Sequence, residues 1–234
     1  MNGTLYLIPS LLDETDTRAV LPQGVIDTIR SLRHFIVENE RTARRFLIKL
    51  NMKEMLDQIR FETLDKHTRP EDFDLIMEPL RKGIPMGLIS EAGCPGIADP
   101  GADIAAIAHR KGIRVVPLTG PSSILLALMA SGLNGQNFAF NGYLPIKQGD
   151  RSRAIKSLEE RSRKENQTQV FIEAPYRNHQ LLSDLLSILH PKTRLCLAIN
   201  ITGPDEKIMT KTVAEWKKVK IEFQKKPAVF LLLA

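Results

Sequence analysis

The sequence predicts an α/β protein of two α/β domains, with mainly parallel sheets and a cleft between the domains. Short β-rich runs alternate with amphipathic stretches along the whole chain, which is typical of repeated strand–helix–strand units. Several of these runs are apolar at consecutive positions, such as PMGLIS at residues 85–90. Strands of this kind are expected to be covered on both faces, as in parallel sheets.

The individual elements follow from hydrophobic periodicity and from the positions of glycine and proline. Strands are predicted at residues 4–8, 34–38, 85–90, 114–118, 138–140, 168–174, 193–199 and 228–234. Helices are predicted at residues 23–32, 40–50, 71–83, 101–112, 122–132, 150–164 and 175–190. A capping box at residues 68–71 precedes the third helix. We place the domain boundary after the fourth strand, which gives domains at 1–118 and 119–234, although no Ser- or Gly-rich linker marks it.

Composition limits the classes of protein to consider. The chain has 234 residues, of which 43% are hydrophobic and 26% are charged, so it can bury a core. Its longest apolar runs are far shorter than the ~20 residues of a membrane span, and no basic segment precedes the first one. Two cysteines, Cys94 and Cys196, form neither a disulfide framework nor a zinc site. We therefore expect a cytoplasmic protein without a membrane segment or a metal. The net charge of +6 permits a polyanionic partner such as RNA, but it is modest for a chain of this size and is more often a feature of surface solvation.

Two constrained loops follow predicted strands. The first, SEAGCPGIADPG at residues 90–101, holds three glycines and two prolines. Glycine lets the backbone approach a ligand, and proline fixes the backbone in advance. The second is TGPSS at residues 119–123. Neither loop matches a phosphate-binding pattern. Because ligands of parallel sheets bind where strands end, these loops are the predicted binding surface.

Four segments, in this order and spacing, resemble the tetrapyrrole methylase superfamily: SEAGCPGIADPG, TGPSSILLALMASGL, FAFNGYLPIKQGDR and FIEAPYRNHQLL. Within the superfamily they are most similar to the branch that methylates a ribose 2′-hydroxyl of small-subunit ribosomal RNA. The resemblance implies a homodimer, with S-adenosylmethionine in the cleft between two α/β domains. Carried over by position, the implied cofactor-binding residues are Ser90, Gly93, Pro95, Ile97, Ala98, Asp99, Thr119, Ser122, Leu144 and Ala174.

Three segments depart from the pattern of the ribosomal RNA branch. The first loop, IPSLLDETDTR at residues 8–18, lacks the usual glycines, and the usual EDTR reads Glu38-Asn39-Glu40-Arg41. The usual ELTK near the C-terminus reads Asn200-Ile201-Thr202-Gly203. Two alternatives therefore stay open beside ribosomal RNA methylation. One is a methyltransferase acting on a tetrapyrrole precursor, and the other is a cofactor-binding relative with lost or altered catalysis.

Candidate catalytic and substrate-binding residues lie near these motifs. A hydroxyl acceptor benefits from a general base, and the carboxylates nearest the motifs are Glu38, Glu91 and Glu173. For Glu38 the alternative is a salt bridge to Arg41, and for Glu173 it is a capping role. Arginine matches phosphate geometry, so we expect RNA contacts from Arg41, Arg44 and Arg151. For these arginines the alternative is a solvated helix face.

Overall fold

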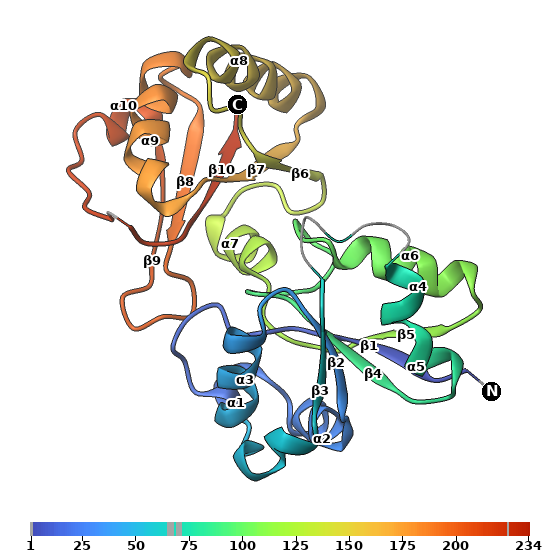
Figure 1. Ribbon diagram of the computed structural model, residues 1–234. Helices are drawn as coiled ribbons and strands as arrows, with labels where there is room; N and C mark the ends of the chain where they lie inside the picture. Colours follow the sequence, from blue (N-terminus) through green and yellow to red (C-terminus); the bar gives the residue numbers. More distant parts are fainter. Residues whose placement is uncertain (1, 65–67, 69–71, 224) are drawn as a thin grey trace. The chain divides into compact units, whose positions relative to one another are not determined.

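The computed structural model describes residues 2–64, 68, 72–223 and 225–234. The chain folds as two compact units, Met1–Ser122 and Ser123–Ala234. Figure 1 labels their helices and strands.

The first unit contains a five-stranded sheet in the order β3-β2-β4-β1-β5, in which every pairing is parallel. Its strands are β1 (Thr4–Ile8), β2 (His34–Val37), β3 (Arg60–Thr63), β4 (Met86–Ile89) and β5 (Arg114–Pro117). Its helices are α1 (Thr17–Val20), α2 (Gln23–Ser31), α3 (Glu40–Lys49), the 3-10 helix η1 (Lys53–Gln58), α4 (Phe73–Ile76), α5 (Glu78–Arg81) and α6 (Gly101–Arg110).

Helices cover both faces of this sheet because successive strand residues point to opposite sides. Phe35 and Val37 of β2 belong to a core with α2 and α3, whereas Ile36 between them belongs to a core with α4, α5 and α6. The two helical layers lie on either side of the sheet in Figure 1. Covered strands of this kind explain the consecutive apolar residues of the sequence.

The second unit contains a five-stranded sheet in the order β6-β7-β10-β8-β9. Its strands are β6 (Phe138–Tyr143), β7 (Thr168–Ile172), β8 (Arg194–Ile199), β9 (Lys207–Thr212) and β10 (Ala228–Leu233). Its helices are α7 (Ser123–Ser131), α8 (Gln148–Glu165), the 3-10 helix η2 (Pro175–Arg177), α9 (Asn178–Ile188) and α10 (Val213–Trp216). Only β6 and β7 pair in parallel, and the other three pairings are antiparallel. Across both sheets, parallel pairings outnumber antiparallel ones, so the predicted fold class is confirmed.

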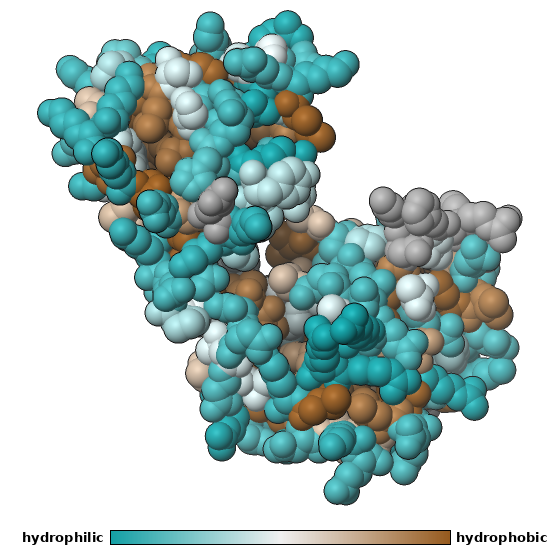
Figure 2. Space-filling view, turned by 60° about the vertical axis from the view of Figure 1, so that its left-hand side comes forward, coloured by the Kyte–Doolittle hydropathy of each residue, from teal (hydrophilic) through white to brown (hydrophobic). Residues whose placement is uncertain are grey.

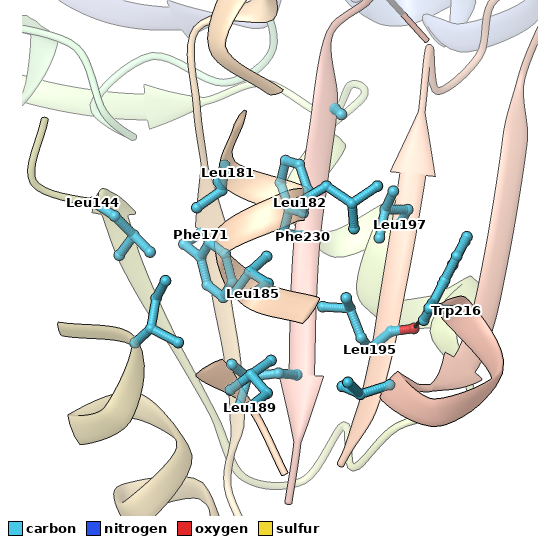
Figure 3. Packing of buried hydrophobic residues seen from close by; sticks show 14 of the residues in the cluster. Leu144, Phe171, Leu181, Leu182, Leu185, Leu189, Leu195, Leu197, Trp216 and Phe230 are labelled. Atoms are coloured by element: carbon cyan, nitrogen blue, oxygen red, sulfur yellow. Dashed lines mark hydrogen bonds between the residues drawn. The ribbon is translucent and has the colours of Figure 1, made fainter. Parts of the chain in front are cut away.

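The main core of the second unit lies between its sheet and helices α8 and α9. Figure 3 shows Leu181 and Leu185 of α9 near Phe171 of β7 and Phe230 of β10. The Phe171 and Phe230 rings stack with their centroids 5.8 Å apart. On the other face of the sheet lies α7, where the Thr210 hydroxyl of β9 donates to the Ser131 carbonyl at 2.6 Å.

Three predictions about elements need comment. The predicted helix at residues 71–83 is two short helices, α4 and α5, with Pro79 in the first turn of the second. The capping box at residues 68–71 and the start of this helix involve residues 69–71, which lie outside the described residues. Strands β3 and β9 were not predicted, because both are edge strands with largely polar sequences, RFET and KIMTKT.

The described part of the chain contains no helix that is both long and apolar enough to cross a membrane. On the face shown in Figure 2, hydrophobic residues form small areas among hydrophilic ones.

Candidate functional site

The first unit gathers polar residues at the carboxyl ends of three neighbouring strands. Ser10 follows β1, Glu38 follows β2 and Ser90 follows β4, and these strands lie side by side in the order β2-β4-β1. The Ser10 backbone N–H donates to the Gly93 carbonyl at 2.9 Å, which joins the loop after β1 to the loop after β4. This edge is where parallel sheets bind ligands.

Asp99 organises the first predicted loop. Its Oδ1 accepts hydrogen bonds from the backbone N–H groups of Gly96 at 2.8 Å and Gly101 at 2.7 Å. A Cβ at Gly101 would lie 2.8 Å from this same oxygen, so the close approach requires glycine. Asp99 Oδ2 is buried and has no hydrogen-bond partner in the described structure. One carboxylate oxygen thus shapes the loop, while the other stays available for a hydrogen bond.

The two predicted loops contact each other. The Cys94 thiol donates to the Pro121 carbonyl at 3.5 Å, and a Cβ at Gly93 would lie 3.6 Å from that carbonyl oxygen. Burial raises the pKa of the Cys94 thiol above its ordinary value, and the Asp99 carboxylate adds to this rise. Because the thiolate is disfavoured, Cys94 fits a packing role better than a nucleophilic one.

The expected cofactor-binding residues of the first unit lie along these loops. Ser90 is buried, and its hydroxyl donates to the Gly93 carbonyl at 2.9 Å. Ile97 is 45% exposed, and Ala98 beside it is exposed with a φ of 64°. The other members of the expected set in this unit are placed as follows: Pro95 buried, Ser122 buried and Thr119 exposed. The loops therefore present backbone groups and small apolar side chains to solvent.

Leu144 and Ala174 belong to the second unit. Leu144 follows β6 and packs in the core of that unit, and Ala174 lies between β7 and η2. Their expected part in cofactor binding stays a prediction.

Glu38 is half-buried at the end of β2. Its Oε1 accepts a hydrogen bond from the Glu91 backbone N–H at 3.4 Å. Burial raises the pKa of Glu38 above its ordinary value, and the nearby carboxylates of Asp99 and Glu91 raise it further, whereas the bond from the Glu91 N–H opposes the rise. The salt bridge to Arg41 that the sequence allowed does not form among the described residues. Within the described part of the chain, Glu38 is thus a carboxylate without a cationic partner, as expected of a proton acceptor.

The other two candidate bases are already engaged. Glu91 is exposed and accepts a short hydrogen bond from the Thr42 hydroxyl of α3. Glu173 is buried, and its Oε1 accepts from Arg177 Nε at 2.9 Å, from Arg177 Nη2 at 2.6 Å and from the Ala174 N–H at 2.7 Å. The Glu173 carboxylate is thus held in an ion pair with Arg177. Glu173 therefore fits the capping alternative that the sequence left open.

A small pocket and an adjoining groove lie beside Glu38. The pocket, of about 30 Å³, is lined by Ser10, Glu38, Asn39, Thr42, Ser90 and Glu91, among others. The groove, of about 520 Å³, lies between the loop after β1 and helix α3, and shares Ser10, Thr42 and Glu91 with the pocket. Sequence reasoning did not find the groove, because its walls are separated by about thirty residues of chain. No three carboxylate, histidine or cysteine side chains in the described ranges are grouped to hold a metal ion.

The candidate RNA-binding arginines of α3 differ in their environment. Arg41 is exposed, and its side chain makes no ion pair within the described structure. Arg44 instead pairs with Glu40 at 2.7 Å, and its guanidinium lies 4.8 Å from the centroid of the Phe61 ring. Asn39 caps this helix by accepting from the Arg41 and Thr42 N–H groups, which fixes its start at the edge of the site.

The predicted RNA contact of Arg151 is wrong. Its side chain is only 7% exposed and donates from Nε and Nη2 to Asp184 Oδ2 at 2.6 Å. Its Nη1 donates to the Ile146 carbonyl at 2.7 Å. With its charge neutralised inside the unit, Arg151 holds α8 against α9 instead of facing a phosphate.

The geometry defines a class of protein: a two-unit α/β protein with two constrained loops in contact at the carboxyl edge of a parallel sheet. Known structures share this fold. The crystal structure of the methyltransferase CobJ matches with a TM-score of 0.65 and 16% identity, covering 99% of this chain and 94% of that one. The crystal structure of diphthine synthase matches with a TM-score of 0.68 and 16% identity, covering 99% of this chain and 89% of that one.

Residues 18–217 match the family model of the tetrapyrrole (corrin/porphyrin) methylases. The ribosomal RNA small subunit methyltransferase I of Vibrio cholerae is 30% identical over 211 residues, which cover 90% of this chain and 69% of that protein. The protein of the same name from Escherichia coli O157:H7 is 29% identical over 213 residues, which cover 91% of this chain and 70% of that protein. The chain belongs to the tetrapyrrole methylase family and is a methyltransferase, which confirms the resemblance found in the sequence.

Proposed function

We propose that this chain uses S-adenosylmethionine to methylate a ribose 2′-hydroxyl of small-subunit ribosomal RNA. The observation that carries the proposal is the contact between the two loops at Cys94 and Pro121 in a chain of this family. The ribosomal RNA target is supported by the names of the similar proteins from Vibrio cholerae and Escherichia coli.

The loops of the first unit fit S-adenosylmethionine. An adenosine with a sulfonium group needs apolar walls and a few backbone hydrogen bonds, and it has no phosphate. Exposed Ile97 supplies apolar surface, and the positive φ angles of Gly93, Gly96 and Ala98 turn the loop backbone. The unpartnered Oδ2 of Asp99 supplies an acceptor. We therefore propose that Ser90, Gly93, Pro95, Ile97, Ala98, Asp99, Thr119 and Ser122 hold the cofactor.

S-adenosylmethionine, when bound, supplies a methyl group on a positively charged sulfur. The residues of this chain hold and orient the acceptor hydroxyl, which can lower the barrier by roughly 7–11 kcal/mol. The loops are suited to this task because their shape is set before binding, through the Asp99 hydrogen bonds and the Ser10–Gly93 bridge.

Labelled methyl transfer tests the proposal. Small ribosomal subunits from a strain that lacks the gene are incubated with methyl-labelled S-adenosylmethionine, and the RNA is then digested in alkali. A 2′-O-methyl group blocks alkaline cleavage of its linkage, so the label should remain in a dinucleotide. Label in a tetrapyrrole precursor and none in RNA would support the first alternative. Cofactor binding in calorimetry without transfer to either acceptor would support the second.

We also propose that the protein acts in the cytoplasm as a homodimer, as the resemblance implies. Two large apolar side chains one turn apart on α7, Leu125 and Met129, are 49% and 78% exposed, which supports an association surface on the second unit. Sedimentation velocity distinguishes a dimer from the 26.3 kDa monomer. A Met129→Glu variant should then sediment as a monomer.

A further inference from the structure

The groove beside Glu38 has the size and the lining expected for a nucleotide. Its volume of about 520 Å³ lies within the usual range for small-molecule sites. Apolar side chains of Leu11, Leu12, Phe46 and Ile48 form part of its wall, and such surfaces suit the flat face of a base. Arg45 also lines the groove.

Arg45 offers the groove a cation. It is exposed, and no ion pair or hydrogen bond engages its guanidinium in the described structure. The neighbouring Lys49 instead pairs with Glu14 at 2.8 Å across the groove lining. An unpaired guanidinium at the rim of an apolar groove matches a phosphate beside a base.

The groove adjoins the pocket that Glu38 lines. Ser10, Thr42 and Glu91 line both cavities, so the two cavities adjoin. The Ser10 side chain lines the pocket, is only 4% exposed, and has a hydroxyl without a partner in the described residues. A buried hydroxyl without a partner costs free energy, which a hydrogen bond to an incoming ligand would offset.

We propose that this groove receives the acceptor nucleotide and that Glu38 takes the proton from its ribose hydroxyl, which Ser10 orients. The inference rests on the proposed function and adds the base and the acceptor site to it. The hydroxyl oxygen forms a bond to the methyl carbon, and the carbon–sulfur bond breaks with its electron pair remaining on sulfur. The hydroxyl proton passes to the Glu38 carboxylate, so charge and atoms balance.

Of the three candidate carboxylates, only Glu38 combines the required properties. Glu91 accepts from Thr42, and Glu173 is neutralised by Arg177. The charged groups that face Glu38 from the loop after β4 are the carboxylates of Glu91 and Asp99. The charged groups on the other elements around the two cavities are Asp13 and Glu14 after β1, and Arg45 and Lys49 on α3.

The test compares Glu38→Gln with Glu54→Gln, a control at an exposed glutamate of η1. Wild-type protein must first transfer methyl to small subunits, and failure at this step counts against the proposed function alone. We then expect Glu38→Gln to lower the single-turnover rate by about 10²–10⁴-fold. Calorimetry with S-adenosylmethionine and filter binding of small subunits should give dissociation constants within about 3-fold of wild type. A rate for Glu38→Gln equal to that of Glu54→Gln would overturn the inference.

A pH profile gives a second, independent readout. The wild-type rate should rise with pH as Glu38 loses its proton, over a range above the ordinary pKa of glutamate. Glu91→Gln removes a neighbouring negative charge, so this rise should move to lower pH. A rise that persists in Glu38→Gln, or that does not move in Glu91→Gln, would show that another group takes the proton. Arg45→Gln should weaken subunit binding and leave the affinity for S-adenosylmethionine unchanged.

Discussion

The thiol of Cys94 lies 3.5 Å from the carbonyl oxygen of Pro121, and this contact joins the two loops that the sequence marks as the binding surface. The residues are 27 positions apart and follow different strands, β4 and β5. In the sheet, β4 and β5 both pair with β1, one on each side. The two loops meet across the end of β1, and Ser10, which follows β1, forms a bridge to Gly93 of the first loop.

Gly120 should not tolerate a side chain. A Cβ at this position would lie 2.2 Å from Pro9 Cγ, and overpacking of this kind costs about 1–3 kcal/mol. We expect Gly120→Ala to lower the free energy of unfolding by this amount in urea denaturation. Gly135→Ala is the control, since nothing lies within 4 Å of its Cβ. Equal stability of the two variants would contradict the described packing against Pro9.

Asp99→Ala should loosen the first loop and weaken cofactor binding. The substitution leaves the N–H groups of Gly96 and Gly101 without their acceptor, at a cost of about 1–3 kcal/mol. We expect the affinity for S-adenosylmethionine in calorimetry to fall by about tenfold or more. Asp103→Ala, which removes an exposed carboxylate from the first turn of α6, should retain the wild-type affinity.

Glu38→Gln should stabilise the protein at neutral pH. The pKa of Glu38 is raised in the folded state by burial and then by Asp99 and Glu91, so the folded state holds this proton more tightly than the unfolded state does. The stability that comes from the protonated form is therefore lost as pH rises through the raised pKa. The difference in unfolding free energy between variant and wild type should grow from about pH 4 to about pH 7. A difference that shrinks over this range would contradict the raised pKa.

Arg41 and Arg44 should respond differently to substitution. Arg41→Ala removes an unpaired, exposed cation, so subunit binding should weaken and its salt dependence should decrease by about one counterion. Arg44→Ala removes a guanidinium that is already paired with Glu40, and its effect on the salt dependence should be smaller. Filter binding over a series of salt concentrations measures both. The affinity for S-adenosylmethionine should stay unchanged in each variant.

Arg151→Ala should destabilise the second unit. It leaves Asp184 as a buried carboxylate without a counter-charge, which costs about 3–5 kcal/mol. Arg153→Ala, two residues along the same helix, removes an exposed side chain and should change stability by less than about 0.5 kcal/mol. Urea denaturation of the two variants measures the difference, and similar midpoints would argue against the internal ion pair.

The sequence predicts the central strands well and the edges poorly. The apolar runs of β1, β4 and β10 stand out because both of their faces are covered. Edge strands β3 and β9 have polar residues at positions that solvent reaches, so no periodicity marks them. The division of one predicted helix into α4 and α5 follows from Pro79, which cannot continue a helix from the preceding turn.

The constrained shape of the two loops was predictable, whereas the environments of the arginines were not. Glycine and proline shape a loop through local backbone preferences, so SEAGCPGIADPG shows its character within twelve residues. The role of Arg151 depends on Asp184, which lies 33 residues further along the chain. A cluster of basic residues does not reveal which members face inward. The partner of Glu173 is different, because Arg177 lies only four residues further along the chain and their ion pair is a local contact.

The central place of β10 sets an order for folding during synthesis. All five strands of the first sheet have been translated by Pro117, so that unit can form while later residues are still inside the ribosomal exit tunnel. The second sheet lacks its middle until Ala228–Leu233 emerges to pair with both β7 and β8. Until then the backbone edges of β7 and β8 that pair with β10 remain without their partner, and the nascent second unit is the stage at which a chaperone would be needed.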